Sequence, residues 1–125
     1  MRLKVSATGL YTYPDVIVAD AEPAFEDTKV DTFLNPILLV EVLSKSTESY
    51  DRGRRFSHYQ KLQSLQEYVL VSQYEFRVEQ YMRQADGKWL YAETTDPHGH
   101  VVFDSIACRI PMEGLCHRVN FKTEE

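Results

Sequence analysis

The stretch 36–56, PILLVEVLSKSTESYDRGRRF, places one carboxylate, Glu41, inside a run of apolar residues. Four aliphatic residues precede Glu41 and two follow it, a pattern that predicts a strand buried on both faces of a sheet. An ionised carboxylate is costly to bury unless it is paired, hydrogen-bonded or bound to a metal. Glu41 is therefore either held by structural partners or part of a functional site.

A helix is predicted to follow this strand. Asp51 is suited to cap a helix that runs to about Leu62. Helical spacing puts Arg55 and Tyr59 on one side, so the same face carries a cation and an apolar anchor. If that face packs on the sheet, Arg55 reaches toward the strand of Glu41.

The remaining strands follow from apolar runs and alternation. Strands are predicted at Leu3–Ser6, Val16–Val18, Glu67–Ser72, Phe76–Gln84, Lys88–Thr94 and Val101–Phe103, with a last helical turn at Pro111–His117. The strand at Glu67–Ser72 follows a helix, which predicts a parallel partner for the Glu41 strand. Alternation at Phe76–Gln84 predicts a half-exposed strand, and Asp86-Gly87 predicts a hairpin turn after it.

Length and composition indicate one folded domain. A chain of 125 residues with 43% hydrophobic residues is large enough for a single core, so we take residues 1–125 as one domain. The expected fold class is α/β (α+β), with a mixed central sheet, one main flanking helix and an antiparallel hairpin extension. No apolar run is long enough for a membrane span, and the start of the sequence lacks the apolar core of a signal peptide, so we expect a cytoplasmic protein without membrane contact.

The net charge of −5 gives no general attraction to nucleic acid, so DNA binding would need a local patch. Candidate DNA-contacting cations lie in and just before the predicted helix: Lys45, Arg52, Arg54 and Lys61. A solvated helix face explains this cluster about as well.

Two carboxylates, Asp15 and Glu41, lie on strands that are neighbours along the chain. If the strands are adjacent in the sheet, both groups can converge on one Mg²⁺ ion, which proteins commonly hold by one or two carboxylates. Such a metal would activate water and offset the charge of a phosphodiester. The competing interpretation is purely structural, with Asp15 capping a strand end and Glu41 in a buried ion pair.

Linked blocks of the chain resemble a known family. Pro14-Asp15 followed by Glu41 resembles the PD-(D/E)xK restriction-endonuclease-like superfamily. Between about Tyr11 and Val119, the chain is similar to the restriction endonucleases of the Uma-two type. The blocks that carry this resemblance are YPDVIVAD, LLVEVLSKST, YDRGRRFSHYQKL, QEYVLVSQ and RVEQYMRQADGKW.

The resemblance implies a restriction-endonuclease-like core and a metal-dependent DNA endonuclease. Asp15 and Glu41 would bind Mg²⁺ or Mn²⁺, and the main-chain carbonyl of Val42 would add a ligand. The superfamily's lysine lies two residues after the glutamate, where this chain has Leu43. The resembling family supplies a lysine from the following helix, and the matching position here is Arg55. Arginine keeps the charge but does not act as a base, so the replacement is not conservative.

The N-terminus is a second departure. Only fourteen residues precede Asp15, and none of them is acidic, whereas members of the family usually carry a helical segment there. We expect the N-terminal helix to be missing and part of the sheet to be uncovered, as in a fragment or in a chain completed by a partner subunit.

Three functions stay open at this point. The first is an active Mg²⁺-dependent nuclease, and the second is a degenerate nuclease fold that binds DNA or protein without cutting. The third is a dimerisation module, suggested by the aromatic content and the uncovered sheet. We expect a homo-oligomer, most simply a dimer.

Overall fold

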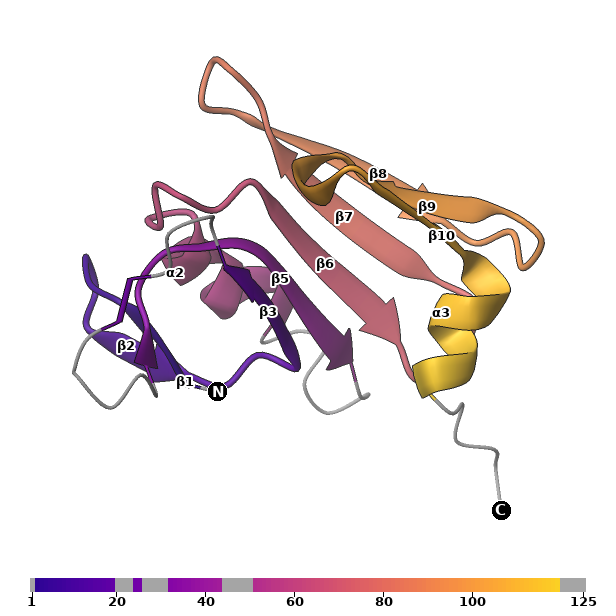
Figure 1. Ribbon diagram of the computed structural model, residues 1–125, viewed down its shortest axis with the longest axis horizontal. Coiled ribbons are helices and arrows are strands. Elements are labelled where there is room, and N and C mark those ends of the chain that lie inside the picture. The colour runs from indigo at the N-terminus through magenta and orange to yellow at the C-terminus, as the bar shows by residue number, and fades with distance from the viewer. Residues whose placement is uncertain (1, 20–23, 26–31, 44–50, 120–125) are drawn as a thin grey trace.

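A five-stranded mixed sheet forms the centre of the molecule (Figure 1). The computed structural model describes residues 2–19, 24–25, 32–43 and 51–119. At residues 33, 51, 52 and 116–119 it describes only the backbone. The strand order is β3-β5-β6-β7-β8. These strands are β3 (Val16–Ala19), β5 (Pro36–Leu43), β6 (Glu67–Ser72), β7 (Val78–Arg83) and β8 (Trp89–Thr94). The predicted mixed central sheet is confirmed.

Two smaller sheets lie on either side of the central one. The first has the order β2-β1-β4, with β1 (Arg2–Val5), β2 (Leu10–Thr12) and β4 (Thr32–Phe33). The second pairs β9 (His100–Phe103) with β10 (Cys108–Pro111), joined by a 3₁₀ turn, Asp104–Ile106, and followed by α3 (Met112–Val119). The sequence analysis did not predict β2, β4 and β10; of these, β2 has three residues and β4 two, too few to show a period. Within the described residues, no helix has the length and apolar character needed to cross a membrane.

The strand of Glu41, β5, pairs on both sides. It is antiparallel to β3, with Val16 opposite Val40, and parallel to β6, with Glu41 opposite Leu70. The predicted adjacency of the Asp15 and Glu41 strands and the predicted parallel partner are both confirmed. Along β5 every side chain is buried or partly buried, as the apolar run indicated.

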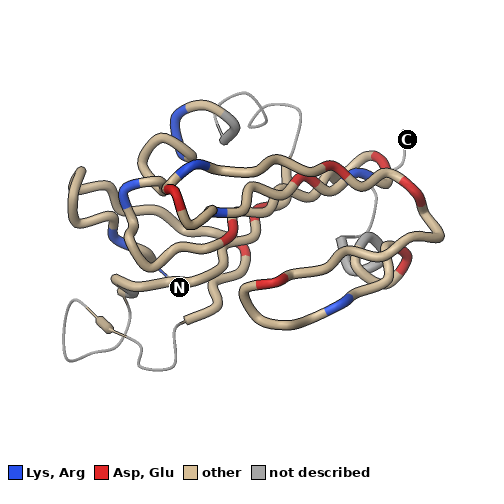
Figure 2. Tube along the Cα trace, turned by 90° about the horizontal axis from the view of Figure 1, so that it is seen from above, with Lys and Arg blue, Asp and Glu red and all other residues tan. Residues whose placement is uncertain are grey.

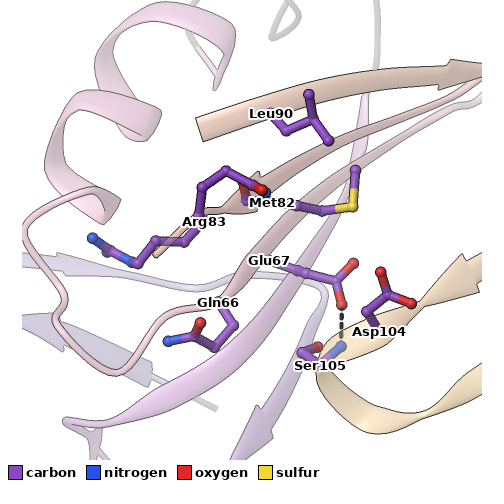
Figure 3. Close-up of a pocket in the computed structure, with 8 residues that line it drawn as sticks. Gln66, Glu67, Met82, Arg83, Leu90, Asp104 and Ser105 are labelled. Carbon is purple, nitrogen blue, oxygen red and sulfur yellow. Dashed lines mark hydrogen bonds between the residues drawn. The ribbon is translucent and has the colours of Figure 1, made fainter. Parts of the chain in front are cut away.

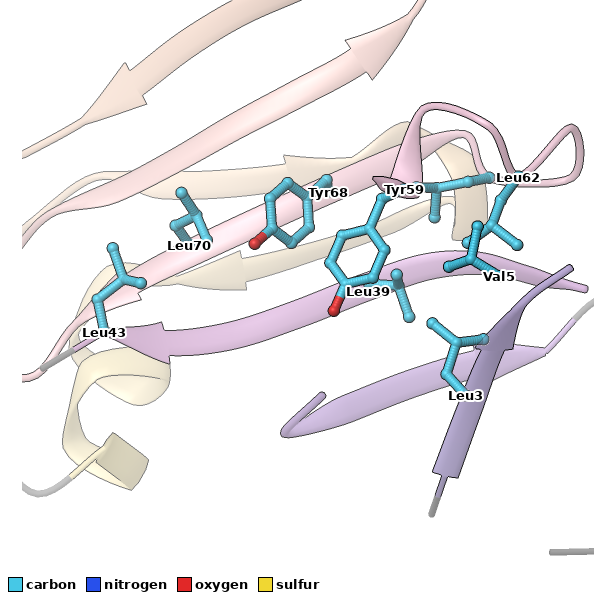
Figure 4. Packing of buried hydrophobic residues seen from close by; sticks show 9 residues of the cluster. Leu3, Val5, Leu39, Leu43, Tyr59, Leu62, Tyr68 and Leu70 are labelled. Atoms are coloured by element: carbon cyan, nitrogen blue, oxygen red, sulfur yellow. The ribbon is translucent and has the colours of Figure 1, made fainter. Parts of the chain in front are cut away.

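Each face of the central sheet has its own hydrophobic core. One core lies under the N-terminal sheet and under the crossover segment, by which we mean residues 51–66 leading into β6 (Figure 4). It consists of Leu3, Val5, Leu39, Leu43, Tyr59, Leu62, Leu65, Tyr68 and Leu70. The other lies under β9, β10 and α3 and consists of Leu38, Val69, Val71, Val78, Val101, Phe103 and Met112. On this second face an apolar groove remains, lined mainly by Val16, Val18, Val40, Ile110 and Leu115.

The predicted helix at 51–62 is shorter than expected. A π-helical turn, η1 (Asp51–Arg55), leads into one α-helical turn, α2 (Phe56–Tyr59), after which the chain continues in tight turns. Arg83 of β7 explains this ending, because its guanidinium donates hydrogen bonds to the carbonyls of Gln60, Leu62 and Leu65. A cation that binds these carbonyls satisfies the helix end without further helical turns.

The prediction of a half-exposed β7 is wrong for its first half. Val78, Glu79 and Gln80 are all buried, because the second sheet covers one face and side chains of β8 cover the other. Gln80 Nε2, for example, donates to the carbonyl of Val102 in β9 at 2.9 Å. The hairpin turn is confirmed, and Gly87 adopts a φ of 84°, which residues with a Cβ rarely adopt.

We predict that replacing a leucine of the core under the N-terminal sheet by alanine lowers the free energy of unfolding more than replacing an exposed leucine does. Leu39→Ala should lower the free energy of unfolding by about 2–5 kcal/mol, because Leu39 is fully buried and the substitution leaves a cavity. Leu90→Ala, at a leucine that is 54% exposed, should change it by less than about 0.5 kcal/mol. Urea unfolding of both variants tests this, and equal losses would contradict the assignment of the core.

Candidate functional site

Glu41 is buried, and three side chains donate hydrogen bonds to its carboxylate. Arg55 Nη1 donates to Oε1 at 2.7 Å, and the Tyr59 hydroxyl donates to the same oxygen at 3.2 Å. The Tyr68 hydroxyl donates to Oε2 at 2.6 Å. Glu41 is 2% exposed and Arg55 28% exposed, so the ion pair lies at the edge of the core. The predicted approach of Arg55 to the Glu41 strand is therefore observed.

Tyr59 links Glu41 to the N-terminal sheet. Its hydroxyl lies 3.3 Å from Thr12 Oγ1 on β2. Because the single Tyr59 proton goes to Glu41, the Thr12 hydroxyl is the donor to Tyr59. Burial first, and then the negative charge of Glu41, raise the pKa of Tyr59 well above its usual value.

Asp15 lies at the entrance of β3, and its carboxylate caps the neighbouring strand. Oδ2 accepts a hydrogen bond from the backbone N–H of Val42 at 2.7 Å. Val42 lies beyond the last residue of β5 that pairs with β3, so the carboxylate takes the place of a ladder partner. The N–H and C=O of one strand residue point to the same neighbour, so the carbonyl of Val42 faces the edge that carries Asp15.

Oxygen donors for a small divalent cation remain at this point of the sheet. Glu41 accepts three hydrogen bonds, and a carboxylate offers about four acceptor positions. Asp15 Oδ1 makes no hydrogen bond within the described part of the chain. Two carboxylates and a main-chain carbonyl match the oxygen ligands of Mg²⁺. The described residues contain no group of three or more metal-binding side chains, so water or substrate would complete the shell.

The other predicted site residues lie around this point or outside the described residues. Arg54, in η1, and Lys61, in the turns after α2, are exposed. Arg52 lies in η1, where the structure describes the backbone only. Lys45 lies outside the described residues.

A second buried carboxylate, Glu79, repeats the pattern of Glu41. It is 2% exposed, accepts a hydrogen bond from the Tyr91 hydroxyl at 2.6 Å and lies 3.6 Å from Arg77 Nη2. The strand register places Glu41, Leu70, Glu79 and Glu93 in one row across the sheet. Burial, followed by the hydrogen bond to Glu79, raises the pKa of Tyr91 to about 12. Alternation in β7 suggested a surface residue here, so the sequence carried no signal for this pair.

A third buried carboxylate, Glu67, anchors the 3₁₀ turn on the other face of the sheet. Its Oε1 accepts from the Ser105 backbone N–H at 2.7 Å, as Figure 3 shows, and its Oε2 accepts from Gln80 Nε2 at 3.3 Å. Asp104 and Met82 line the adjoining cavity. Because neutral donors reach both oxygens of Glu67, we assign it a structural role.

Comparisons with known proteins identify the family of the chain. A family model described as "Uma2: Putative restriction endonuclease" matches residues 1–108. The chain belongs to this family. Two relatives of the Uma2 chain in Synechocystis sp., the uncharacterized proteins sll1609 and slr1290, are 38% identical over 103 residues and 42% identical over 91 residues. These matches cover 82% and 72% of this chain but 58% and 46% of the relatives, so the chain spans about half their length.

A solved structure shows the same fold. It is described as a "putative nuclease belonging to DUF820" from Anabaena variabilis, and it superimposes with a TM-score of 0.73 at 18% sequence identity. The match covers 94% of the Uma2 chain and 65% of the Anabaena protein. The restriction-endonuclease-like fold class that the sequence predicted is thereby confirmed.

The raised pKa of Tyr59 predicts a loss of stability in alkali. The unfolded chain releases this proton near its usual pKa of 10.0, while the folded chain retains it. Stability is therefore complete below pH 10 and falls above it, by about 1.4 kcal/mol per pH unit for one tyrosine. Urea unfolding between about pH 9 and pH 11 should show a shallower fall in Tyr59→Phe. Tyr74→Phe, at an exposed tyrosine, should keep the wild-type slope.

Proposed function

We propose that this Uma2 chain is a metal-dependent endonuclease domain acting on DNA. In this proposal Asp15 and Glu41 hold Mg²⁺ or Mn²⁺, the Val42 carbonyl adds a ligand, and Arg55 is the cation beside the reacting phosphate. The observation that supports the proposal is the 2.7 Å hydrogen bond from the Val42 backbone N–H to the Asp15 carboxylate, at the residue that follows Glu41. The chain belongs to a family described as "Putative restriction endonuclease".

Each residue has a task that follows from its contacts. A metal bound between the carboxylates would lower the pKa of a water and offset the negative charge of the phosphodiester. Tyr59 and Tyr68 hold the Glu41 carboxylate in one orientation, since both donate to it. Arg55 holds a positive charge next to Glu41, so it could stabilise charge that develops on the phosphate. It remains charged at all working pH values and takes no proton from water.

The distribution of charge supports a nucleic acid as the substrate. Figure 2 shows that Lys and Arg gather mainly at the end of the molecule that carries the N-terminus. Asp and Glu extend along the strands toward the other end. Arg54 and Lys61, with the predicted Arg52 and Lys45, would contact phosphates near the site.

A second candidate is a nuclease fold that binds DNA without cutting it. The occupation of three acceptor positions of Glu41 by one cation and two hydroxyls favours it, because these donors compete with a metal for the carboxylate. The Arg55 charge also cancels that of Glu41 and leaves Asp15 as the net charge of the site. In this candidate the arginine has replaced both the metal and the base.

Cleavage assays distinguish the two candidates. In the presence of Mg²⁺ or Mn²⁺ the chain should nick a supercoiled plasmid, and EDTA should stop it. Asp15→Asn should reduce the rate about 10²–10³-fold, because asparagine still accepts the Val42 hydrogen bond but carries no charge for the metal. The matched control is Asp86→Asn, at an exposed hairpin aspartate that also accepts a backbone hydrogen bond. Wild-type activity in Asp15→Asn would refute the proposed metal site.

Arg55→Lys tests the role of the arginine. If Arg55 serves only as a cation, cleavage by Arg55→Lys should stay within about tenfold of the wild type, since one charge replaces another. Cleavage that appears only in Arg55→Lys would identify the non-cutting candidate as the natural state. Thermal unfolding of each variant separates loss of the fold from loss of chemistry.

We also propose that residues 1–125 form one domain that associates as a dimer in the cytoplasm. Sedimentation velocity of the purified chain at micromolar concentrations checks the oligomeric state. A monomer throughout would contradict the dimer and would also argue against a dimerisation module.

A further inference from the structure

The outer face of the N-terminal sheet carries cations and aromatic rings together. Leu3 and Val5 of β1 are fully buried against the core, so Arg2 and Lys4 lie on the opposite face. Lys4 stands opposite Tyr11 of β2 in the register. We define the outer patch as Arg2, Lys4, Tyr11 and Tyr13.

Arg2 is held in place by groups that leave its terminal nitrogens available. Its Nε donates to Thr32 Oγ1 at 2.8 Å, and its guanidinium lies 4.8 Å from the centre of the Tyr11 ring. Nη1 and Nη2 make no hydrogen bond within the described residues. A guanidinium oriented in this way presents two parallel donors, which is the geometry that phosphate oxygens accept.

The ammonium of Lys4 lies 5.4 Å from the centre of the same ring, so two cations meet at Tyr11. The first fourteen residues contain these two cations and no acidic residue, in a chain whose net charge is −5. By sequence, this N-terminal segment is therefore positively charged, in contrast to the chain as a whole. Its charge complements the phosphate backbone of nucleic acid.

Tyr13 adds an exposed ring beside the candidate site. It is 69% exposed, more than any other large apolar or aromatic residue recorded in the described part of the chain. Asp15 follows two residues later, and two residues of chain span at most about 7 Å. Exposed rings next to cations bind single strands, because every base can stack on a ring regardless of sequence.

We propose that the outer patch binds unpaired DNA and leads it to the site at Asp15 and Glu41. Arg2 and Lys4 neutralise phosphates, and Tyr13 stacks an unpaired base next to the reacting phosphate. The proposal rests on the proposed function and adds its substrate class, a single strand or a duplex with an opened segment. An intact duplex hides its base faces and would use the cations alone.

Fluorescence anisotropy with a labelled oligothymidine tests the proposal in EDTA, where binding is measured without cleavage. The wild-type chain should bind the single strand more tightly than a duplex of the same length. Tyr13→Ala should weaken single-strand binding about 5- to 150-fold through the loss of stacking, and Tyr13→Phe should keep it. Tyr74→Ala removes another exposed tyrosine and should bind as the wild type does.

The salt dependence tests the cations. The double variant Arg2→Gln, Lys4→Gln should lower the slope of log K against log salt by about 1.4, or about 0.7 for each lost phosphate contact. The matched control, Lys88→Gln with Arg109→Gln, changes the net charge equally at two exposed positions outside the patch. Thermal unfolding checks that each variant is folded.

Three outcomes would overturn the inference: no binding by the wild type at about 100 µM, equal binding by Tyr13→Ala, or equal slopes in both double variants. These outcomes are independent of the proposed chemistry. If the wild type cleaves plasmid with Mg²⁺ but Tyr13→Ala binds the single strand as tightly as the wild type does, the nuclease function stands and the outer patch is not the substrate surface. A chain that fails to cleave but shows the expected binding keeps the surface.

Discussion

The burial of one carboxylate in the middle of β5 is the constraint on which the structure depends. Glu41 loses nearly all contact with water, and its donors come from three elements: Arg55 in η1, Tyr59 in α2 and Tyr68 in β6. Removing one partner of a buried ion pair typically costs about 3–5 kcal/mol, because the other charge stays behind. The crossover segment is therefore attached to the sheet by a polar contact inside an otherwise apolar core.

The same contact limits the chemistry that the site can perform. Two carboxylates on neighbouring strands attract a divalent cation, but Arg55 at 2.7 Å offsets the charge of Glu41. Whether the site holds a metal thus depends on the balance between this ion pair and the coordination of Mg²⁺. Arginine in place of lysine shifts that balance, because its charge is permanent and its planar group can bind the carboxylate and a phosphate together.

Asp15 connects the N-terminal sheet with the central sheet. It follows directly on the N-terminal sheet, and its side chain holds the backbone of β5 at Val42. Thr12 makes a parallel connection through Tyr59 to Glu41. Tyr11 and Tyr13 of the outer patch therefore lie on the same short segment as Asp15, so a strand of DNA bound at Tyr13 would arrive beside the site without a long path across the surface.

Local sequence patterns were sufficient to predict a structure where a short stretch of residues is compatible with one kind of local structure. The apolar run around Glu41 required a strand buried on both faces, and Asp86-Gly87 required a hairpin, because only these structures satisfy such residues. The pairing of Arg55 with Glu41 also followed from helical spacing and the cost of an unpaired buried charge.

Only the tertiary structure decided which surfaces were covered and where the helix ended. Glu79 alternates like a surface residue and is buried because Tyr91 and Arg77 of the sheet cover it. The helix stops at Tyr59 because Arg83, distant in sequence, binds the carbonyls that follow. The sequence alone determined the buried charge and its strand, since these depend on neighbouring residues. The hydrogen bonds of Tyr59 and Tyr68 to Glu41, and that of Asp15 to Val42, depend on contacts between distant segments, which no local pattern contains.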